Sequence, residues 1–358
     1  MAHIVPASWG AKCQDKLTFA VSWAPAHWKD PTVTPLRTLA AGLAAGSLLL
    51  AGCSSTGGRA AAEASAGAGG CTETTMTVTL ITHSAPGDDF WDLVRKGAED
   101  AAKKDCIALE YQASPDGAEQ ANLVNAAVDK KVDGIAVTLG KPDQMGAAVR
   151  AAVTAGIPVT ALNGGVDVWQ DLGVIGFFGQ EDRVAGQKTG EKLKAEGAKK
   201  VLCVLHEQGN VGNDARCAGV KQVLPSTENL YVNGVDQADV QTKITAKLQQ
   251  DSSIDTVLGL KASVALTAVT SAREARSEAK IATFDTNAEL VKAIKDGTVE
   301  FAVDQQPYLQ GYLAIDALWL YRTNGNTIGG GTATLTGPAF VDTSNVEQID
   351  AFAAAGKR

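Results

Sequence analysis

Short apolar runs rich in β-branched residues alternate with longer amphipathic segments over residues 76–162. Strand-like runs occur at 77–81, 107–111, 133–138 and 157–162, and helix-like segments lie between them at 90–104, 117–131 and 142–156. The strand-like runs are apolar at nearly every position, which is typical of parallel strands covered by helices on both faces. This alternation predicts a parallel α/β sheet.

The same alternation begins again after about residue 178. Strand-like runs follow at 200–205, 230–235, 256–260 and 280–284, with helix-like segments at 182–197, 213–224, 239–251, 263–275 and 287–297. The pattern therefore predicts an α/β fold with two doubly wound, Rossmann-like lobes. Such sheets bind ligands at the carboxyl ends of their strands, so two facing sheets predict a cleft.

A different pattern precedes the first strand. Arg37 is followed by an apolar run of Ala, Leu and Gly that stops at Leu-Ala-Gly-Cys, ending with Cys53. The run is short for a membrane span and ends in small residues, which is typical of a secretion signal. Its ending resembles the bacterial lipobox, in which the cysteine becomes the lipidated first residue; the alternative is an ordinary signal peptide with an incidental cysteine.

The segments around this run are interpreted from their composition. Residues 1–52 form a leader and lipoprotein signal peptide, and 1–32 fit this role so poorly that they indicate an over-extended gene start. Residues 53–70 are rich in Gly, Ala and Ser and cannot bury enough apolar surface to fold, so they predict a tether. From Cys71 onward roughly 290 residues follow, enough for two lobes. The net charge of −8, without a basic stripe, argues against nucleic acid as a partner.

Four cysteines fall in the part that is expected to fold: Cys71, Cys106, Cys203 and Cys217. An even number in a secreted protein suggests disulfides. Cys71 and Cys106 precede neighbouring strands, whose spacing is close to that of a disulfide, so this pair is geometrically reasonable. Cys203 and Cys217 would join a strand to the helix that follows it. The alternative is four free buried thiols.

Six motifs occur in a characteristic order: SAPGDDFW at 84–91, DGIAVT at 133–138, AGIPVTALN at 155–163, CAGVK at 217–221, ATFD at 282–285 and DQQP at 304–307. With them, residues 76–321 resemble the type I periplasmic sugar-binding proteins, the ribose-binding-like group. The resemblance implies a three-strand hinge between an amino-terminal lobe (71–179 plus 306–333) and a second lobe (180–305 plus 334–358). It also implies lobes that close on the ligand and are read by an ABC importer.

The resemblance implies an aromatic wall for the cleft. Phe90 and Trp91 match the pair that stacks against a sugar ring, where axial C–H groups pack on a flat ring. The alternative is that both are the first core residues of an ordinary helix. Asp88 and Asp89 precede them; one can cap the helix while the other accepts from a ligand hydroxyl, and the sequence does not decide between them.

Further ligand-binding residues implied by the resemblance are polar groups at or near strand ends: Thr138, Asn163, Asp182, Asp214, Lys261, Asp285 and Gln305. Buried carboxylates accept strong hydrogen bonds from hydroxyls, although each residue alone could be a cap or a solvated loop residue. Ribose binders place arginines where this chain has Gly164 and Asp214. We therefore expect an Arg-poor, carboxylate-rich cleft that suits a pentose, a hexose, an inositol or a linear sugar alcohol better than ribose.

Other function classes find little support. The chain has no Gly-x-Ser-x-Gly, Walker, His-Glu-x-x-His or Cys-x-x-Cys motif, and His83 and His206 have no evident metal or nucleophile partner. No enzyme activity, cofactor or metal is therefore predicted. A secretion signal also replaces the DNA-binding segment of repressors with this fold.

The sequence thus predicts a monomeric, extracytoplasmic, lipid-anchored protein that binds a small neutral sugar or polyol for an ABC permease. The alternative is a sugar-sensing module that signals to a membrane partner.

Overall fold

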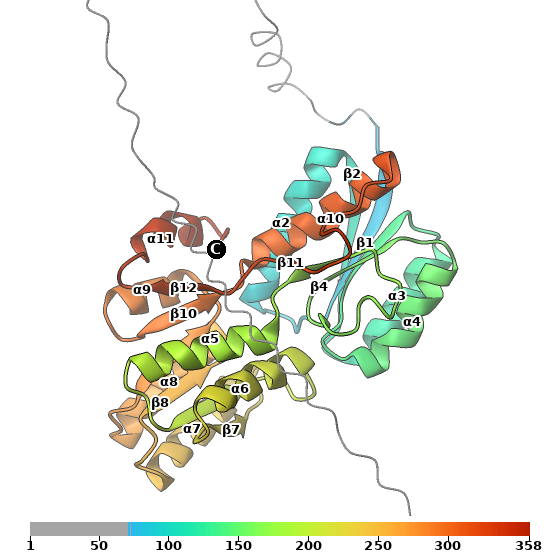
Figure 1. Cartoon of the computed structure of the whole chain (residues 1–358). Coiled ribbons are helices and arrows are strands. Elements are labelled where there is room, and N and C mark those ends of the chain that lie inside the picture. Colours follow the sequence, from blue (N-terminus) through green and yellow to red (C-terminus); the bar gives the residue numbers. More distant parts are fainter. Residues whose placement is uncertain (1–70, 72) are drawn as a thin grey trace, which may run out of the picture. The chain divides into compact units, whose positions relative to one another are not determined.

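The computed structural model describes residues 71 and 73–358 (Figure 1). The expected leader 1–52, the expected lipidation site Cys53 and the predicted tether 53–70 lie outside the described residues. The described part contains two six-stranded sheets, each with helices on both faces. No helix in this part is long and apolar enough to cross a membrane.

The first sheet is entirely parallel and has the order β11-β5-β4-β3-β1-β2. Its strands are β1 (Met76–Thr82), β2 (Ile107–Ala113), β3 (Gly134–Thr138), β4 (Val159–Asn163), β5 (Gly176–Gly179) and β11 (Thr334–Leu335). Its helices are α2 (Asp89–Asp105), α3 (Gly117–Asp129), α4 (Pro142–Thr154) and α10 (Pro307–Asn324). β3, β4 and β5 are buried at every position, as strands covered on both faces must be.

The second sheet has the order β12-β10-β9-β8-β6-β7. Its strands are β6 (Val201–Leu205), β7 (Glu228–Tyr231), β8 (Thr256–Gly259), β9 (Lys280–Phe284), β10 (Phe301–Asp304) and β12 (Ala339–Asp342). Its helices are α5 (Asp182–Ala195), α6 (Val211–Val223), α7 (Gln237–Gln250), α8 (Ala262–Ala275), α9 (Ala288–Lys295) and α11 (Glu347–Ala354). The edge strand β12 runs antiparallel to β10, in contrast to the wholly parallel pattern expected from the sequence.

The chain passes between the sheets three times, after β5, β10 and β11. Hydrogen bonds join these crossings to one another, because the Thr336 hydroxyl donates to the carbonyl of Gln305 at 2.7 Å and the Thr336 amide donates to the carbonyl of Gly179 at 2.6 Å. The third crossing lies two residues beyond the expected boundary at 333/334. The reason is that β11, residues 334–335, pairs with β5 and so extends the first sheet.

Two pairs of helices cross at glycines. A Cβ on Gly97 of α2 would lie 1.9 Å from the carbonyl oxygen of Tyr308 in α10, and one on Gly186 of α5 would lie 2.1 Å from that of Arg216 in α6. Only glycine allows backbones to approach so closely. These crossings fix α2 and α6, whose first turns face the cavity described below.

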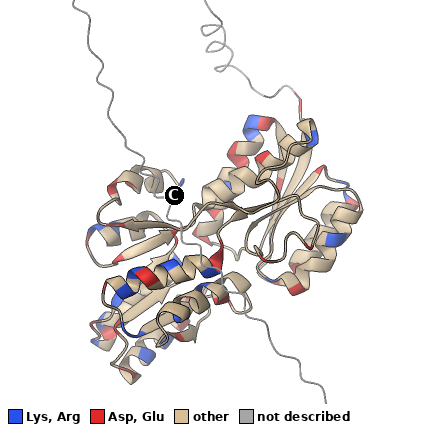
Figure 2. Cartoon of the chain, viewed as in Figure 1, with Lys and Arg blue, Asp and Glu red and all other residues tan. Residues whose placement is uncertain are grey.

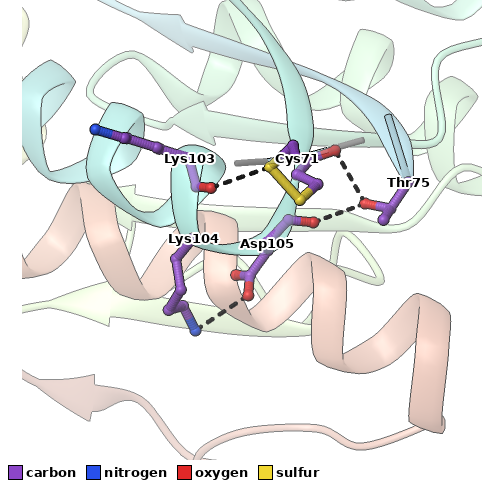
Figure 3. Close-up of a disulfide and its surroundings, with 6 residues drawn as sticks. Cys71, Thr75, Lys103, Lys104 and Asp105 are labelled. Atoms are coloured by element: carbon purple, nitrogen blue, oxygen red, sulfur yellow. Dashed lines mark hydrogen bonds and ion pairs between the residues drawn. A yellow bond between two sulfur atoms is a disulfide. The ribbon is translucent and has the colours of Figure 1, made fainter. Parts of the chain in front are cut away.

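The structure joins the cysteines in the two expected pairs. Cys71 and Cys106 have a Cα separation of 5.4 Å, and Cys203 and Cys217 one of 5.9 Å. Cys106 is the left-handed C-cap of α2, with φ 58°, so the first pair ties the start of the described chain to the end of this helix (Figure 3). The Thr75 hydroxyl adds a hydrogen bond to the carbonyl of Asp105 at 2.8 Å. The second pair ties α6 to β6.

Candidate functional site: a cavity between the two sheets

The carboxyl ends of strands from both sheets surround a cavity of about 460 Å³. The first lobe contributes four of the residues expected from the sequence: Asp88, Phe90, Trp91 and Asn163. The second lobe contributes four more: Asp182, Lys261, Asp285 and Gln305. The other three expected residues, Asp89, Thr138 and Asp214, do not line the cavity.

The aromatic wall comes from the first turn of α2. The Asp88 carboxylate caps this helix by accepting from the amide of Phe90 at 3.2 Å, which places Phe90 and Trp91 at its start. Their rings meet edge to face with centroids 5.0 Å apart, and both residues are more than 90% buried. Both also pack in the hydrophobic core between α2 and α10. Phe90 and Trp91 therefore line the cavity and belong to the hydrophobic core at the same time.

A buried arginine crosses the floor of the cavity. Nε of Arg216 donates to Oδ1 of Asp182 at 2.7 Å, and another guanidinium nitrogen donates to Oε1 of Gln305 at 3.3 Å. The guanidinium carbon lies 4.8 Å from the ring centroid of Phe284. The expectation of an Arg-poor cleft is therefore wrong. The family resemblance aligned Asp214 with an arginine of the ribose binders. In this chain Arg216, two positions further along, supplies the guanidinium.

Asp285, Gln305 and Asn163 form a chain of side-chain hydrogen bonds at the strand ends. The amide of Gln305 donates to Oδ1 of Asp285 at 2.6 Å, and the amide of Asn163 donates to Oε1 of Gln305 at 3.0 Å. Asp285 and Asn163 have φ values of 68° and 65°, a left-handed conformation that Asp and Asn tolerate better than most residues. Burial raises the pKa of Asp285 to about 7, although Arg216 and Gln305 oppose the rise.

His83 forms a buried polar cluster on the other side of the cavity. Its Nδ1 lies 2.7 Å from the Thr138 hydroxyl, and its Nε2 lies 3.3 Å from the Asn210 amide of the second lobe. Burial lowers the pKa of His83, even though Glu207 favours the charged ring. Thr138 therefore does not line the cavity but supports a residue that does. Its hydroxyl positions the imidazole of His83, and its carbonyl accepts from the side-chain amide of Gln120.

Apart from Oε1 of Glu207, which pairs with Lys141, two buried polar atoms of cavity-lining residues have no hydrogen-bond partner: Nδ2 of Asn213 and Nδ1 of His206. Burial lowers the pKa of His206 to about 3, so its ring is neutral. An unpartnered buried polar group costs free energy unless a ligand or water satisfies it. Both atoms are therefore available to a ligand that carries hydroxyl groups.

Contacts between the lobes hold them together beside the cavity. Nζ of Lys261 lies 2.8 Å from Oδ2 of Asp88, and the amide of Asn287 donates to Oδ2 of Asp89 at 2.8 Å. Asp88 thus lines the cavity and caps α2, whereas Asp89 lies outside and holds the opposite lobe. Asp214 also lies outside the cavity and accepts from the Tyr231 hydroxyl at 3.1 Å.

Sequence reasoning missed the binding face of α6. Its cap Asn210 and its residues Asn213 and Arg216 all line the cavity at intervals of three. Residues three apart share a helix face, so this Asn-x-x-Asn-x-x-Arg spacing was the available signal. To include Asn210 as the cap, the helix has to begin at Val211, before the expected start at 213.

The site contains charged and amide side chains but no metal-binding arrangement. Within the described residues, no three His, Cys, Asp or Glu side chains are grouped so that they could hold a metal ion. Over the described helices and loops, acidic and basic side chains are interspersed (Figure 2).

Comparison with known proteins places this architecture among binding proteins. The family described as "periplasmic binding protein domain" matches residues 78–326. The solved structure of a carbohydrate transporter from Acidothermus cellulolyticus 11B, in complex with myo-inositol, is 51% identical, with a TM-score of 0.78 over 79% of this chain and 99% of that chain. A periplasmic sugar-binding protein from Legionella pneumophila is 25% identical, with a TM-score of 0.67 over 73% of this chain and 99% of that chain.

A relative found by sequence agrees with this placement. The ribose import binding protein of Bacillus subtilis is 25% identical over 254 residues, which are 68% of this chain and 80% of the relative. These relatives are sugar-binding transport proteins, not enzymes.

Proposed function

The chain belongs to the periplasmic binding protein domain family, among the sugar-binding proteins of ABC transporters, and on this premise we propose that it captures a neutral cyclic polyol, with myo-inositol as the first candidate. The polyol binds in the cavity between the lobes, which close over it. An ABC permease then receives the ligand. Lipidation at Cys53 holds the protein at the outer face of the cell membrane.

The observation that carries this proposal is the composition of the buried part of the cavity. Carboxylate, guanidinium and amide groups of Asp182, Arg216, Asp285 and Gln305 converge beside the rings of Phe90 and Trp91. A cyclic polyol offers both an apolar face of C–H groups and a rim of hydroxyls, so it satisfies both halves of this surface.

Charge balance favours a neutral ligand. Arg216 is paired with Asp182 and Lys261 with Asp88, so the two buried cations of the cavity already have carboxylate partners. A charged ligand would have to break such a pair inside a site of low dielectric. The similarity to the myo-inositol complex from Acidothermus cellulolyticus supports the choice among neutral polyols.

Isothermal titration calorimetry with the purified protein tests the proposal. We expect myo-inositol to bind with a Kd in the micromolar range or below, about −8 kcal/mol or more, and more tightly than xylose, arabinose or ribose. Tighter binding of one of these pentoses would reject the inositol assignment and keep the sugar class. Binding of amino acids or nucleosides in place of all polyols would reject the class itself.

A further inference from the structure

The cavity has two parts that differ in exposure. The inner chamber consists of residues that are more than 90% buried: Phe90, Trp91, Asp182, Arg216, Asp285 and Gln305. The outer chamber is formed by Tyr231, Asn233 and Val235 after β7 and by Lys243 of α7, with Pro115 of the first lobe. Tyr231 is 46% exposed and Val235 is 64% exposed. The inner chamber alone supplies the polar groups assigned to a polyol ring, so the outer chamber is additional space.

The loop of the outer chamber is held firmly against the second sheet. Although the sequence predicts a strand over 230–235, β7 ends at Tyr231. The amide of Gly234 donates to the carbonyl of His206 at 3.0 Å, and the amide of Asn233 donates to Oδ2 of Asp239 at 2.8 Å. A Cβ on Gly234 would lie 2.6 Å from Cβ of His206, so the loop contacts the end of β6 directly. Its side chains are therefore presented in a fixed arrangement.

Tyr231 offers an oriented aromatic surface in this chamber. Its hydroxyl donates to Oδ1 of Asp214 at 3.1 Å, which fixes the ring while nearly half of the residue stays exposed. Val235 and Pro115 add aliphatic surface to the same cavity. Aromatic and aliphatic surfaces of this kind suit the C–H face of a sugar ring.

The charges around the outer chamber favour a neutral group. Lys243 lies 3.0 Å from Asp239, and Lys141 lies 3.3 Å from Glu207, so both lysines have carboxylate partners. A phosphate group would have to compete with these partners. The buried, unpartnered Nδ1 of neutral His206 borders the same cavity and can bond to a hydroxyl.

We propose that the outer chamber binds a second sugar ring, so that the ligand class extends to glycosylated polyols. The polyol ring occupies the inner chamber, and a neutral hexose attached to it packs on Tyr231 and Val235 and bonds to Asn233 and His206. This inference rests on the proposed function, because it assumes that the inner chamber holds a polyol.

Calorimetric titration of the full chain with free myo-inositol and with a set of myo-inositol monogalactosides, substituted at each ring hydroxyl in turn, tests the proposal. At least one galactoside should bind within tenfold of free myo-inositol or more tightly. The Tyr231→Ala change should weaken binding of that galactoside about tenfold and leave binding of free myo-inositol within twofold. Tyr231→Phe keeps the ring and should retain most of the galactoside affinity.

Tyr321→Ala is the matched control, because Tyr321 is similarly exposed at 39% but lies on α10 and does not line the cavity. It should change neither affinity. If every galactoside binds more than tenfold more weakly than free myo-inositol, the inference is overturned while the proposed function stands. The inference also fails if Tyr231→Ala weakens both ligands equally or neither. Absence of binding by free myo-inositol and all galactosides alike would reject both proposals.

Discussion

Asp285 is a buried carboxyl group, and we expect its titration to make the stability of the fold depend on pH. Its folded pKa of about 7 lies above the ordinary value of 3.8, because burial disfavours the charged form. Between these two values the folded state keeps a proton that the unfolded chain loses. Its contribution to the free energy of unfolding is therefore fully present below about pH 4 and is lost as the pH rises to about 7.

The Asp285→Asn change should remove this dependence. The ligand-free variant should lose less stability than the original protein between pH 4 and pH 8, and at pH 8 it should be more stable by on the order of a few kcal/mol. Urea unfolding at a series of pH values measures both slopes. Parallel pH profiles for the two proteins would contradict the buried, protonated carboxyl.

The same substitution should weaken ligand binding. An amide is a poorer acceptor for ligand hydroxyls than a carboxylate, so we expect the Kd for myo-inositol to rise about tenfold to a hundredfold above pH 7. Asp214→Asn is the control, because Asp214 lies outside the cavity and its loss should leave this Kd unchanged. Calorimetry on both variants decides whether Asp285 belongs to the site and Asp214 does not.

The contrast between Asp214 and Arg216 shows what the sequence could not provide. Successive residues of a helix turn by about 100°, so a residue two positions away points to a nearly opposite side. The motif located the helix correctly, but the packing of α6 against α5 and β6 decides which of its side chains face the cleft. Asp88 and Asp89 pose the same problem, since one lines the cavity and its neighbour contacts the other lobe.

At the scale of elements, the two disulfides have different relations to the site. Cys217 follows Arg216 directly and is joined to β6, so this bond fixes the part of α6 that carries the guanidinium. The bond from Cys71 lies at the far end of α2 from Phe90 and Trp91. Both disulfides restrict the unfolded chain, but only the bond between Cys203 and Cys217 lies directly next to a cavity residue.

Removing each bond should therefore separate stability from binding. Cys203→Ala with Cys217→Ala should lower the free energy of unfolding by about 3 kcal/mol and raise the Kd about tenfold. Cys71→Ala with Cys106→Ala is the matched pair, which should cost about 4 kcal/mol with the Kd unchanged. Denaturant unfolding and calorimetry on both variants provide the test. Equal effects on the two Kd values would contradict a special role for α6.

Regular elements were more predictable than their edges. The buried strands β3, β4 and β9 and the amphipathic helices follow the hydrophobic pattern closely, because packing on both faces of a sheet leaves a strong signal. The two-residue strand β11 and the antiparallel β12 leave little pattern, since their pairing depends on partners far away in the sequence. In sequence, residues 232–235 resemble the end of a strand because two valines continue the apolar run. In the structure they form a loop, in which Val232 is buried and Asn233 and Val235 are exposed.

At the scale of the whole molecule, contacts between the lobes should set the residence time of the ligand. Besides the cavity residues, the hydrogen bond from Asn287 to Asp89 joins the lobes at an exposed position. Because it joins residues of different lobes, it favours the arrangement in which the lobes meet. Asp89→Ala should raise the rate constant of myo-inositol dissociation by no more than about fivefold, which stopped-flow fluorescence of Trp91 can measure.

Asp92→Ala provides the comparison for this variant. Asp92 is another acidic residue in the first turn of α2, but it is exposed and does not line the cavity. Both changes should affect the melting temperature of the ligand-free protein equally. A dissociation rate that is the same in the two variants would show that the Asp89 contact does not hold the closed state.

The two-lobed organisation could be predicted from sequence, whereas the detailed composition of the cleft could not. The repeat of the strand and helix pattern after residue 178 is a local signal within each lobe. Pairs such as Asp88 with Lys261 and His83 with Asn210 arise only when the lobes meet. No periodicity within one segment records such a pair.

The disulfide at Cys71 also determines where the proposed lipid-anchored tether would join the folded part of the chain. With lipid at Cys53, the 18 residues to Cys71 reach at most about 60 Å when fully extended. Such a tether would join the folded part at Cys71, which is bonded to the carboxyl end of α2, and the cavity lies at the amino end of this helix, about 25 Å away along its 17 residues. An anchor at Cys53 would thus connect to the first lobe at the end of α2 that lies opposite the cavity. The second lobe would then have no direct connection to the membrane.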